Sequence, residues 1–345
     1  MCAAEPHTHK MRFFNNFLID PKIYPTSGGY RQTMKPIRVI LNPAAGHGNG
    51  ARLLPSIETS LTRHALDYDL VCTDHPGHAI ALTGQAVQDG VEMIVAAGGD
   101  GTLNEVVNGL MQARLTGRPL PVLGVLCAGR GNDFSGSIGI PEEIDLACGL
   151  LKTGQARLLD IGRVTGGIHP EGRYFINCVG VGFDAVGTIE AAKLPRWGGS
   201  LSFLIAILKT IFLYNHAPLA TIEFGGQTLE QRSLMISIMN GRRLGGQFFM
   251  APDSKPDDGL LDLCIAEQMS SFQILRLVPH FMHGTQASQK TIKTGRAARI
   301  QIDGLDGPLP AQTDGEIIST EGRSLLVELL PRQIKVICPL PGAEQ

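Results

Sequence analysis

Residues 91–111 read VEMIVAAGGDGTLNEVVNGLM, and this stretch decides the fold of the chain. Its first seven residues form a short apolar run with β-branched members, which is typical of a strand buried on both faces of a parallel sheet. Gly98, Gly99 and Gly101 then interrupt the run, and apolar residues recur at helical spacing in residues 103–110. The stretch therefore predicts a strand, a glycine-rich turn and a helix.

That turn has the features of a phosphate site. Glycines allow the backbone to approach a ligand closely, and the first amides of a helix, together with the helix dipole, favour an anion. Asp100 departs from this pattern, because a carboxylate repels phosphate. A divalent cation between the two would explain it, as would a role in polarising an incoming hydroxyl. The alternative interpretation is a plain tight turn between a strand and a helix.

Composition describes a globular protein with room for two domains, at 345 residues and 37.0 kDa. Hydrophobic residues make up 43% and charged residues 18%, and the net charge of −2 gives no general attraction to nucleic acid. The seven cysteines are scattered singly without a C-x-x-C pair, which favours reduced thiols in a cytoplasmic protein.

The N-terminus has no apolar segment after a basic start, so no secretory signal is expected. Residues 1–34 lack a clear period and are expected to be an extension outside the fold. The longest apolar run, residues 201–213, contains Lys209 and is too short to span a bilayer. It predicts a helix that is buried in a core or lies along a membrane surface.

Strand patterns alternate with helical ones through the first half of the chain. The expected strands are residues 37–41, 68–73, 91–97 and 121–126. Each is followed by a loop and then a helical pattern, which predicts a parallel, doubly wound sheet of Rossmann type. In such a sheet, ligands bind outside the carboxyl ends of the strands, where the loops of this chain fall.

The pattern changes in the second half. Residues 154–164 predict a strand that leads out of the first sheet. From Tyr174 onward, β-type segments such as YFINCVGVGFDA (residues 174–185) are separated by turns rich in Gly, Asp and Pro. Helical patterns in residues 187–214 and 271–283 interrupt them. A mainly antiparallel, β-sandwich-like domain is therefore expected.

Three further motifs have both a structural and a functional interpretation. GRGNDF (residues 129–134) could be a turn followed by a helix cap. APDSKPDDGLLD (residues 251–262) could be a hairpin loop or a site for a hard cation, which prefers oxygen ligands. QTDGE (residues 312–316) could be a hairpin turn or a pair of functional carboxylates.

Together the motifs resemble the diacylglycerol kinase catalytic-domain family, lipid kinases that include bacterial diacylglycerol kinases and the sphingosine kinases. GGDGT followed by Asn104-Glu105 is the most specific match. NPAAGHG (residues 42–48) precedes it, and GRGNDF, DDGL (residues 257–260) and DGE (residues 314–316) follow it, in the family order; the resemblance covers residues 36–339. NAD kinases and phosphofructokinases are more distantly similar.

The resemblance implies an N-terminal extension (residues 1–34), a nucleotide-binding α/β domain (35–163) and a lipid-binding β-rich domain (164–323). The last segment, residues 324–345, could return a strand to the first domain. The implied activity is ATP-dependent and uses Mg²⁺: the γ-phosphoryl group passes to a lipid hydroxyl, of diacylglycerol or a sphingoid-type alcohol, at the interdomain cleft. Such a reaction belongs to phospholipid biosynthesis.

The resemblance also implies the nucleotide contacts. They are Asn42, Pro43, Gly46, Thr73, Gly98, Gly99, Asp100, Gly101, Thr102, Glu105, Arg130, Asn132 and Asp133. Arg130 stands where many members have Thr, and it could bind phosphate through two donors or face outward. His47 stands in a loop where members often have Lys.

Glu316 would be the general base that takes the proton of the acceptor hydroxyl, with Asp314 orienting it or a metal. Asp100 is the competing candidate for the base. The acidic loop would hold a structural Mg²⁺. Its ligands would be the side chain of Asp258, the carbonyls of Lys255 and Leu260, and Asp160 through water.

The expected partner is a lipid, reached at the membrane surface and held in an apolar crevice, for which residues 194–213 are the candidate. A homodimer through an exposed β edge is compatible with the sequence. Two other functions stay open. One is a soluble small-molecule or NAD-type kinase; the other is a non-catalytic nucleotide-binding regulator, suggested by Arg130 and by the absent loop lysine.

Overall fold

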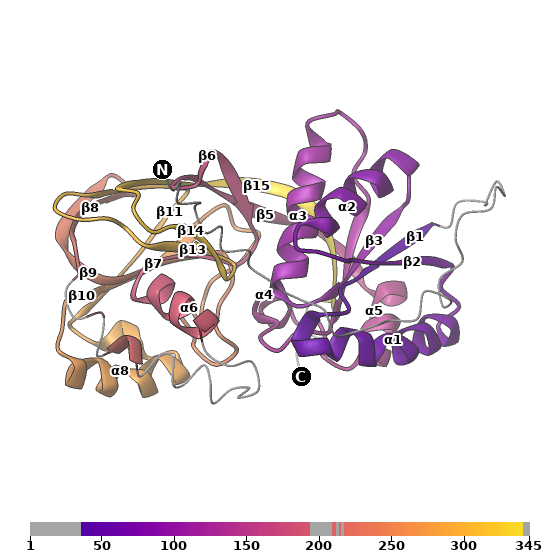
Figure 1. Ribbon diagram of the computed structural model, residues 1–345, viewed down its shortest axis with the longest axis horizontal. Coiled ribbons are helices and arrows are strands. Elements are labelled where there is room, and N and C mark those ends of the chain that lie inside the picture. Colours follow the sequence, from indigo (N-terminus) through magenta and orange to yellow (C-terminus); the bar gives the residue numbers. More distant parts are fainter. Residues whose placement is uncertain (1–35, 194–208, 212–213, 215–216, 341–345) are drawn as a thin grey trace, which may run out of the picture. The chain divides into compact units, whose positions relative to one another are not determined.

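A parallel sheet forms the first half of the computed structural model, which describes residues 36–193, 209–211, 214 and 217–340 (Figure 1). Its strands are β1 (Ile37–Leu41), β2 (Tyr68–Cys72), β3 (Met93–Gly98) and β4 (Val122–Cys127). They lie in the order β2-β1-β3-β4, and all three pairings are parallel. The doubly wound sheet predicted from the sequence is confirmed.

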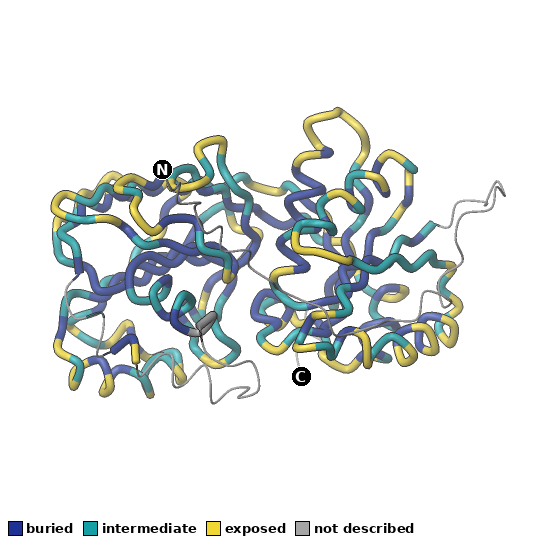
Figure 2. The backbone as a smooth tube through the Cα atoms, viewed as in Figure 1, coloured by how far each residue is buried: buried dark blue, intermediate teal, exposed yellow. Residues whose placement is uncertain are grey.

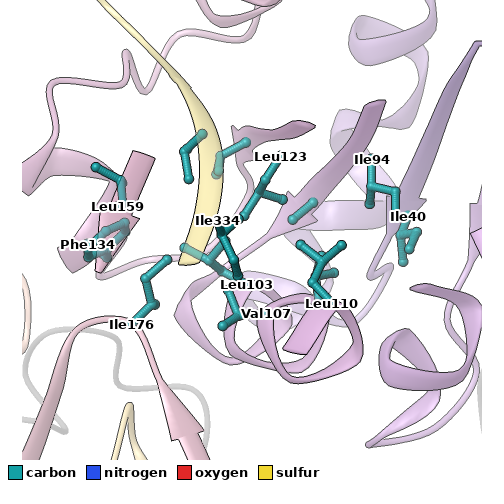
Figure 3. Close-up of a cluster of buried hydrophobic side chains, with 14 of the residues drawn as sticks. Ile40, Ile94, Leu103, Val107, Leu110, Leu123, Phe134, Leu159, Ile176 and Ile334 are labelled. Carbon is teal, nitrogen blue, oxygen red and sulfur yellow. The ribbon is translucent and has the colours of Figure 1, made fainter. Parts of the chain in front are cut away.

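Helices cover both faces of this sheet because its strands are apolar on both sides. On one face, Ile40 and Ile94 pack in a cluster with residues of α2 (His78–Asp89) and α3 (Asp100–Arg114), as Figure 3 shows for α3. On the other face, Val39 packs with residues of α1 (Ala45–Arg63) and α5 (Ile144–Thr153). Successive side chains of a strand point to opposite faces, so a continuous apolar run packs against the helices on both faces of the sheet.

The second half is mainly antiparallel, as predicted. Its strands are β5 (Gln155–Gly166), β6 (His169–Phe175), β7 (Cys178–Gly182), β8 (Leu219–Phe224), β9 (Gln227–Met239), β10 (Leu261–Glu267), β11 (Ile292–Ala297), β12 (Arg299–Gly304), β13 (Ala311–Thr313), β14 (Glu316–Ser319) and β15 (Ser324–Cys338). Buried residues of β5, β7, β8, β9, β12 and β15 form one apolar cluster. This cluster is the core of the β-rich part.

β9 separates that core from a second apolar region. Ile236 and Ile238 belong to the core of the β-rich part, whereas Met235 and Met239 pack with residues of α8 (Ser271–His283). The remaining short elements are α4 (Asp133–Ser137), α6 (Phe183–Lys193) and the 3₁₀ turn η2 (Gln286–Ser288). Figure 2 shows the strands largely buried and α8 mixed in its exposure.

β15 joins the two halves. It pairs with β12 and β5 in antiparallel fashion and with β4 in parallel, through Val336 and Leu123. Ile334 and Leu159, from β15 and β5, enter the same cluster as Leu103 of α3 (Figure 3). The expected domain boundary after residue 163 falls inside β5, and the division into domains stays a prediction.

One local expectation is wrong, and one strand was not predicted. Residues 174–185 do not form one β segment: β6 ends at Phe175, β7 begins at Cys178 and α6 begins at Phe183, because the backbone between the strands turns around a buried carboxylate described below. β11 was not anticipated, because in its six residues only the first and the last are buried. The N-terminal extension and most of the apolar segment 194–213 lie outside the described residues.

Candidate functional site

Two of the expected nucleotide loops meet where the strand order of the parallel sheet reverses, between β1 and β3. Asn42 follows β1 and donates its Nδ2 to Thr102 Oγ1 of α3 at 2.9 Å. The loop after β1 closes through a bond from the Ala51 amide to the Pro43 carbonyl (3.0 Å). Because ligands of doubly wound sheets bind at such a reversal, this is the first place to expect one.

The glycine-rich turn leads directly into α3. Gly99 is the residue before the helix, and no side chain caps the first turn. The first amides of a helix have no partner within the helix and need an acceptor from elsewhere. With the positive end of the helix dipole, they offer a site for an anion.

Three loops form a backbone cradle around this helix start. Residues 46–48 all have a positive φ, and a Cβ on Gly46 would lie 2.7 Å from the Ala128 carbonyl oxygen. A Cβ on Gly129 would lie 2.4 Å from the Cα of Gly99. Ala128 and Gly129 both donate to the Gly98 carbonyl, at 2.8 and 3.2 Å. Only glycine permits these close approaches, which bring the three loops together beside the first amides of α3, where a phosphate group would bind.

Asp100 and Asp133 lie at the edge of the cradle. The Phe134 amide donates to Asp100 Oδ1 (3.4 Å), and both oxygens of Asp133 accept backbone amides, from Gly245 and Gly246 (2.7 Å each). Burial, with the charge of Asp133, raises the pKa of Asp100 to about 7. Burial also raises the pKa of Asp133. Two close, poorly hydrated carboxylates fit a divalent cation, which would relieve both effects.

Arginines border this pair. Arg243 Nε lies 3.7 Å from Asp133 Oδ1, and its Nη2 donates to the Asn132 carbonyl at 3.3 Å. Asn132 precedes α4 in the left-handed conformation, and its side chain does not cap the helix. Arg130 is exposed in the loop after β4.

Asp314 has a different environment. Its carboxylate accepts the backbone amides of residues 176–178 at 2.9, 3.1 and 2.8 Å, and the Asn104 side-chain amide at 2.8 Å. The residue is buried and has a φ of 45°. Burial raises the pKa of Asp314, and these hydrogen bonds oppose the shift. The side chain therefore fixes the turn between β6 and β7 against α3.

Glu316 lies beside this network. Arg173 donates to Glu316 Oε2 at 2.7 Å and to Asn104 Oδ1 at 2.9 Å, so the arginine links the two. Burial raises the pKa of Glu316, while the charge of Arg173 opposes the shift. A carboxylate with a raised pKa, held in place by one guanidinium, is suited to accept a proton.

Two other expected nucleotide residues have structural contacts. Glu105 accepts the amides of Gly77 (2.8 Å) and Ala79 (3.0 Å), and so caps the start of α2 from α3. The Thr73 amide donates to the Leu41 carbonyl at 2.8 Å, which holds the end of β2 beside the end of β1.

The acidic loop wraps around Asp160. This buried carboxylate accepts the amides of Gly259 (2.8 Å) and Arg332 (2.7 Å), and the Asp160 amide donates to the Pro256 carbonyl. Asp160 therefore contacts the loop that contains the three other expected metal ligands, Lys255, Asp258 and Leu260.

The charge of this loop is not balanced. Arg296 pairs with both Asp258 and Asp262, and Asp262 Oδ2 is buried without a hydrogen-bond partner. Asp258 and Asp262 therefore share one guanidinium, while the Asp160 carboxylate is paired with backbone amides. An excess of negative charge with an orphaned oxygen fits a hard cation.

A cavity of about 330 Å³ extends from the carboxylates. At one end it is lined by Asp100, Asp133 and Asp314. Its remaining wall is largely apolar, with residues from α6, β9 and α8 such as Phe183, Met235, Leu277 and Phe281. Asp184, Thr188 and Gln312 are polar exceptions in that wall, and burial raises the pKa of Asp184 to about 6.

Comparison with known proteins agrees with this geometry. The model of the diacylglycerol kinase catalytic domain matches residues 36–164, and that of the YegS C-terminal NAD kinase beta sandwich-like domain matches residues 177–338. Over 321 residues the chain is 30% identical to the diacylglycerol kinase of Bacillus subtilis (strain 168), covering 90% of this chain and 99% of that one. The chain belongs to the diacylglycerol kinase family.

Other members of this lipid kinase family are similar over most of their length. A probable lipid kinase YegS-like of Enterobacter sp. (strain 638) is 32% identical over 306 residues, which cover 88% of this chain and 95% of that one. The crystal structure of a diacylglycerol kinase from Bacillus anthracis str. Sterne has the same fold, with a TM-score of 0.68, 23% identity and coverage of 90% and 99%.

Sequence reasoning missed three polar residues of this lipid kinase site. Asn104 was noticed only as part of the motif, Arg173 lies in a strand without any motif, and Arg243 follows the end of β9. Its position two residues after GGDGT was a usable signal for Asn104. The two arginines gave no signal, because their partners lie 69 to 143 residues away in the chain.

No helix among the described residues combines the length and the apolar character needed to cross a bilayer.

Proposed function

We propose that this chain transfers the γ-phosphoryl group of ATP to the hydroxyl of a lipid, diacylglycerol or a sphingoid-type alcohol, in the cleft between its two halves. Membership of a lipid kinase family supports phosphoryl transfer to a lipid. The identity of the lipid and the roles of the residues around the cavity are part of the proposal.

The cavity carries this proposal. One cavity is lined both by polar groups of the phosphate site, Asp100 and Asp133, and by apolar residues such as Leu277 and Phe281. A soluble acceptor such as a dinucleotide would leave the apolar wall uncovered, whereas an acyl chain would bury it. The apolar wall therefore favours a lipid over the soluble substrate of an NAD-type kinase.

On the phosphate side, the cradle of residues 46–48, 98–101 and 128–131 would hold the nucleotide through backbone amides. Asp100 and Asp133 would share a divalent cation that neutralises charge on the transferred group. Arg243, beside Asp133, is the nearby cation that could take the place of the absent loop lysine. Phosphoryl transfer depends mainly on positioning and charge neutralisation, which such an arrangement can supply.

On the acceptor side, Glu316 would take the proton of the lipid hydroxyl. Arg173 orients Glu316, and Asp314 orients Arg173 indirectly, since both contact Asn104. Asp314 is therefore a positioning residue in this proposal. Asp100 stays the competing base, because it lines the cavity directly.

Mg²⁺ in the acidic loop is a separate proposal, supported by the orphaned oxygen of Asp262. A cation there would join the start of β10 to Asp160 of β5, and so stabilise the fold rather than take part in the reaction. A cytoplasmic location, with contact to the membrane surface, and a homodimer through a β edge also stay proposals.

A phosphotransfer assay tests the function. The protein is incubated with radiolabelled ATP, Mg²⁺ and dispersed diacylglycerol or sphingoid base, and the label in the organic phase is counted. We expect label in one of the lipids and none with Asp100→Ala. If only NAD or another soluble acceptor were labelled, the protein would be a soluble small-molecule or NAD-type kinase instead. Nucleotide binding without any transfer would indicate a regulator.

A further inference from the structure

Helix α8 has apolar residues on two sides. Its inner side, made of Ile274, Leu277, Val278 and Phe281, lines the cavity described above. At 100° per residue these four positions fall within about 100° of the helix circumference. One face of the helix is therefore part of the candidate lipid site.

The outer side of α8 is apolar as well. Phe272, Leu275 and Met282 are 63%, 39% and 42% exposed, and Pro279 between them is also exposed. Spacings of three, four and three residues place these four on one narrow band, about 130° around the helix from the side that lines the cavity. We call this band the outer stripe. Figure 2 shows the same alternation of buried and exposed positions along α8.

Such a stripe is unusual on a helix at the protein surface. A surface helix normally turns a polar face to water, and grouped exposed apolar residues mark an interaction site. The other large apolar residues that are exposed in the described part of the chain, such as Leu115 and Ile168, are not grouped on one helix face. The stripe therefore requires a partner.

The charges beside the stripe indicate what that partner is. α8 contains no acidic residue, and Arg276, His280 and His283 lie along one side of the stripe. The Arg276 guanidinium lies 4.3 Å from the ring centroid of Phe272, so the cation stacks on an apolar ring of the stripe. An apolar band bordered by basic groups is the pattern of helices that lie in the interface of an anionic bilayer.

We propose that the outer stripe of α8 docks this protein on the surface of an anionic phospholipid bilayer. The apolar residues enter the interface and the basic residues contact lipid phosphates. Because the same helix lines the cavity with its inner side, docking brings the bilayer next to the cavity wall. This inference rests on the proposed function, because docking would explain how the lipid substrate reaches the site.

Vesicle flotation without nucleotide tests the docking separately from the reaction. The probes are vesicles of phosphatidylcholine alone and of phosphatidylcholine mixed with phosphatidylglycerol. We expect binding to the mixed vesicles, reduced about tenfold or more in the variant Phe272→Gln/Leu275→Gln/Met282→Gln. Glutamine is a good helix former, so α8 should persist, and circular dichroism checks this. Arg276→Gln should reduce the preference for the mixed vesicles.

The variant Leu115→Gln/Ile168→Gln is the matched control. It removes two more strongly exposed apolar residues, 80% and 68% exposed, from other surfaces, and should bind vesicles like the wild type. Equal vesicle binding by the triple variant and the wild type would overturn the proposal. So would a wild-type protein that ignores vesicles but forms a dimer that the triple variant loses, because the stripe would then be a contact between copies.

Activity separates this proposal from the function itself. The triple variant should phosphorylate detergent-dispersed lipid like the wild type and lose activity only on lipid in vesicles. Vesicle binding that depends on the stripe, in a protein that phosphorylates no lipid, would contradict the proposed function and leave the docking surface in place.

Discussion

Asp314 and Asn104 are 210 residues apart in the chain, yet the Asn104 side-chain amide donates to the Asp314 carboxylate at 2.8 Å. Asn104 is in the first turns of α3, directly after the glycine-rich turn, whereas Asp314 follows β13. The same carboxylate takes three backbone amides between β6 and β7. One side chain thus connects the nucleotide loop to the strands that carry the candidate base.

This relationship predicts a loss of stability when Asp314 is removed. Asp314→Ala leaves three buried backbone amides without an acceptor, and the Asn104 amide keeps only its bond to the Tyr174 carbonyl; each amide left unpaired costs about 1–3 kcal/mol. We expect the free energy of unfolding in urea to fall by at least about 3 kcal/mol. Glu316→Gln, which leaves these donors paired, should stay within about 1 kcal/mol of the wild type. Unchanged stability in Asp314→Ala would contradict the positioning role.

Glu316→Gln should instead act on the reaction. Glutamine keeps the size of the side chain and a hydrogen bond to Arg173 but removes the basic oxygen. Because general base catalysis supplies about 10²–10⁴-fold, kcat with the lipid should fall by that factor. ATP affinity, measured by calorimetry, should be nearly unchanged, whereas Asp100→Asn should weaken Mg·ATP binding. A near wild-type kcat in Glu316→Gln would transfer the role of base to Asp100.

The raised pKa of Asp100 predicts how stability depends on pH in the nucleotide-free protein. Its pKa rises from 3.8 to about 7 on folding, so between these values the folded state holds a proton that the unfolded state has lost. Stability therefore falls as pH rises from 3.8 to about 7, and it levels off above about 7, where the buried carboxylate has ionised. Asp100→Asn cannot ionise, so it should melt higher than the wild type at about pH 8, and this difference should shrink at about pH 5. A lower melting temperature in Asp100→Asn at both pH values would contradict this.

The acidic loop predicts a dependence on Mg²⁺. A cation that binds only the folded protein stabilises it by mass action, so the wild type should melt higher in Mg²⁺ than in EDTA. Asp258→Ala should remove that difference. Asp306→Ala is the matched control, because Asp306 pairs with Arg232 in a similar ion pair outside the loop and its loss should leave the Mg²⁺ effect unchanged. Equal melting temperatures of the wild type in Mg²⁺ and EDTA would indicate an ordinary hairpin stabilised by Arg296.

The sequence predicts the first sheet well because its signals are local. The apolar run, the glycine turn and the helix of residues 91–111 follow one another directly, and each is read from its own few residues. The carboxyl ends of β1, β3 and β4 then bring Asn42, Asp100 and Asp133 to one edge by topology alone.

Contacts between distant segments could not be predicted in this way. Nothing in the neighbourhood of Arg173 indicates that it pairs with Glu316, 143 residues later. Nothing around Glu105 indicates that it caps α2 rather than facing the nucleotide loop. The apolar wall was expected in residues 194–213, but its described part comes from α6, β9 and α8, whose apolar residues look like ordinary core in the sequence.

The pairing of β15 with β4 has a consequence for how the protein is made. Ile334 and Val336 belong to the same core cluster as Leu103 of the glycine-loop helix, and Val336 pairs with Leu123 at the edge of the parallel sheet. A ribosome adds residues from the N-terminus, so during synthesis this core stays open on one side while more than two hundred further residues emerge. The phosphate cradle can reach its final packing only after the last strand has been released.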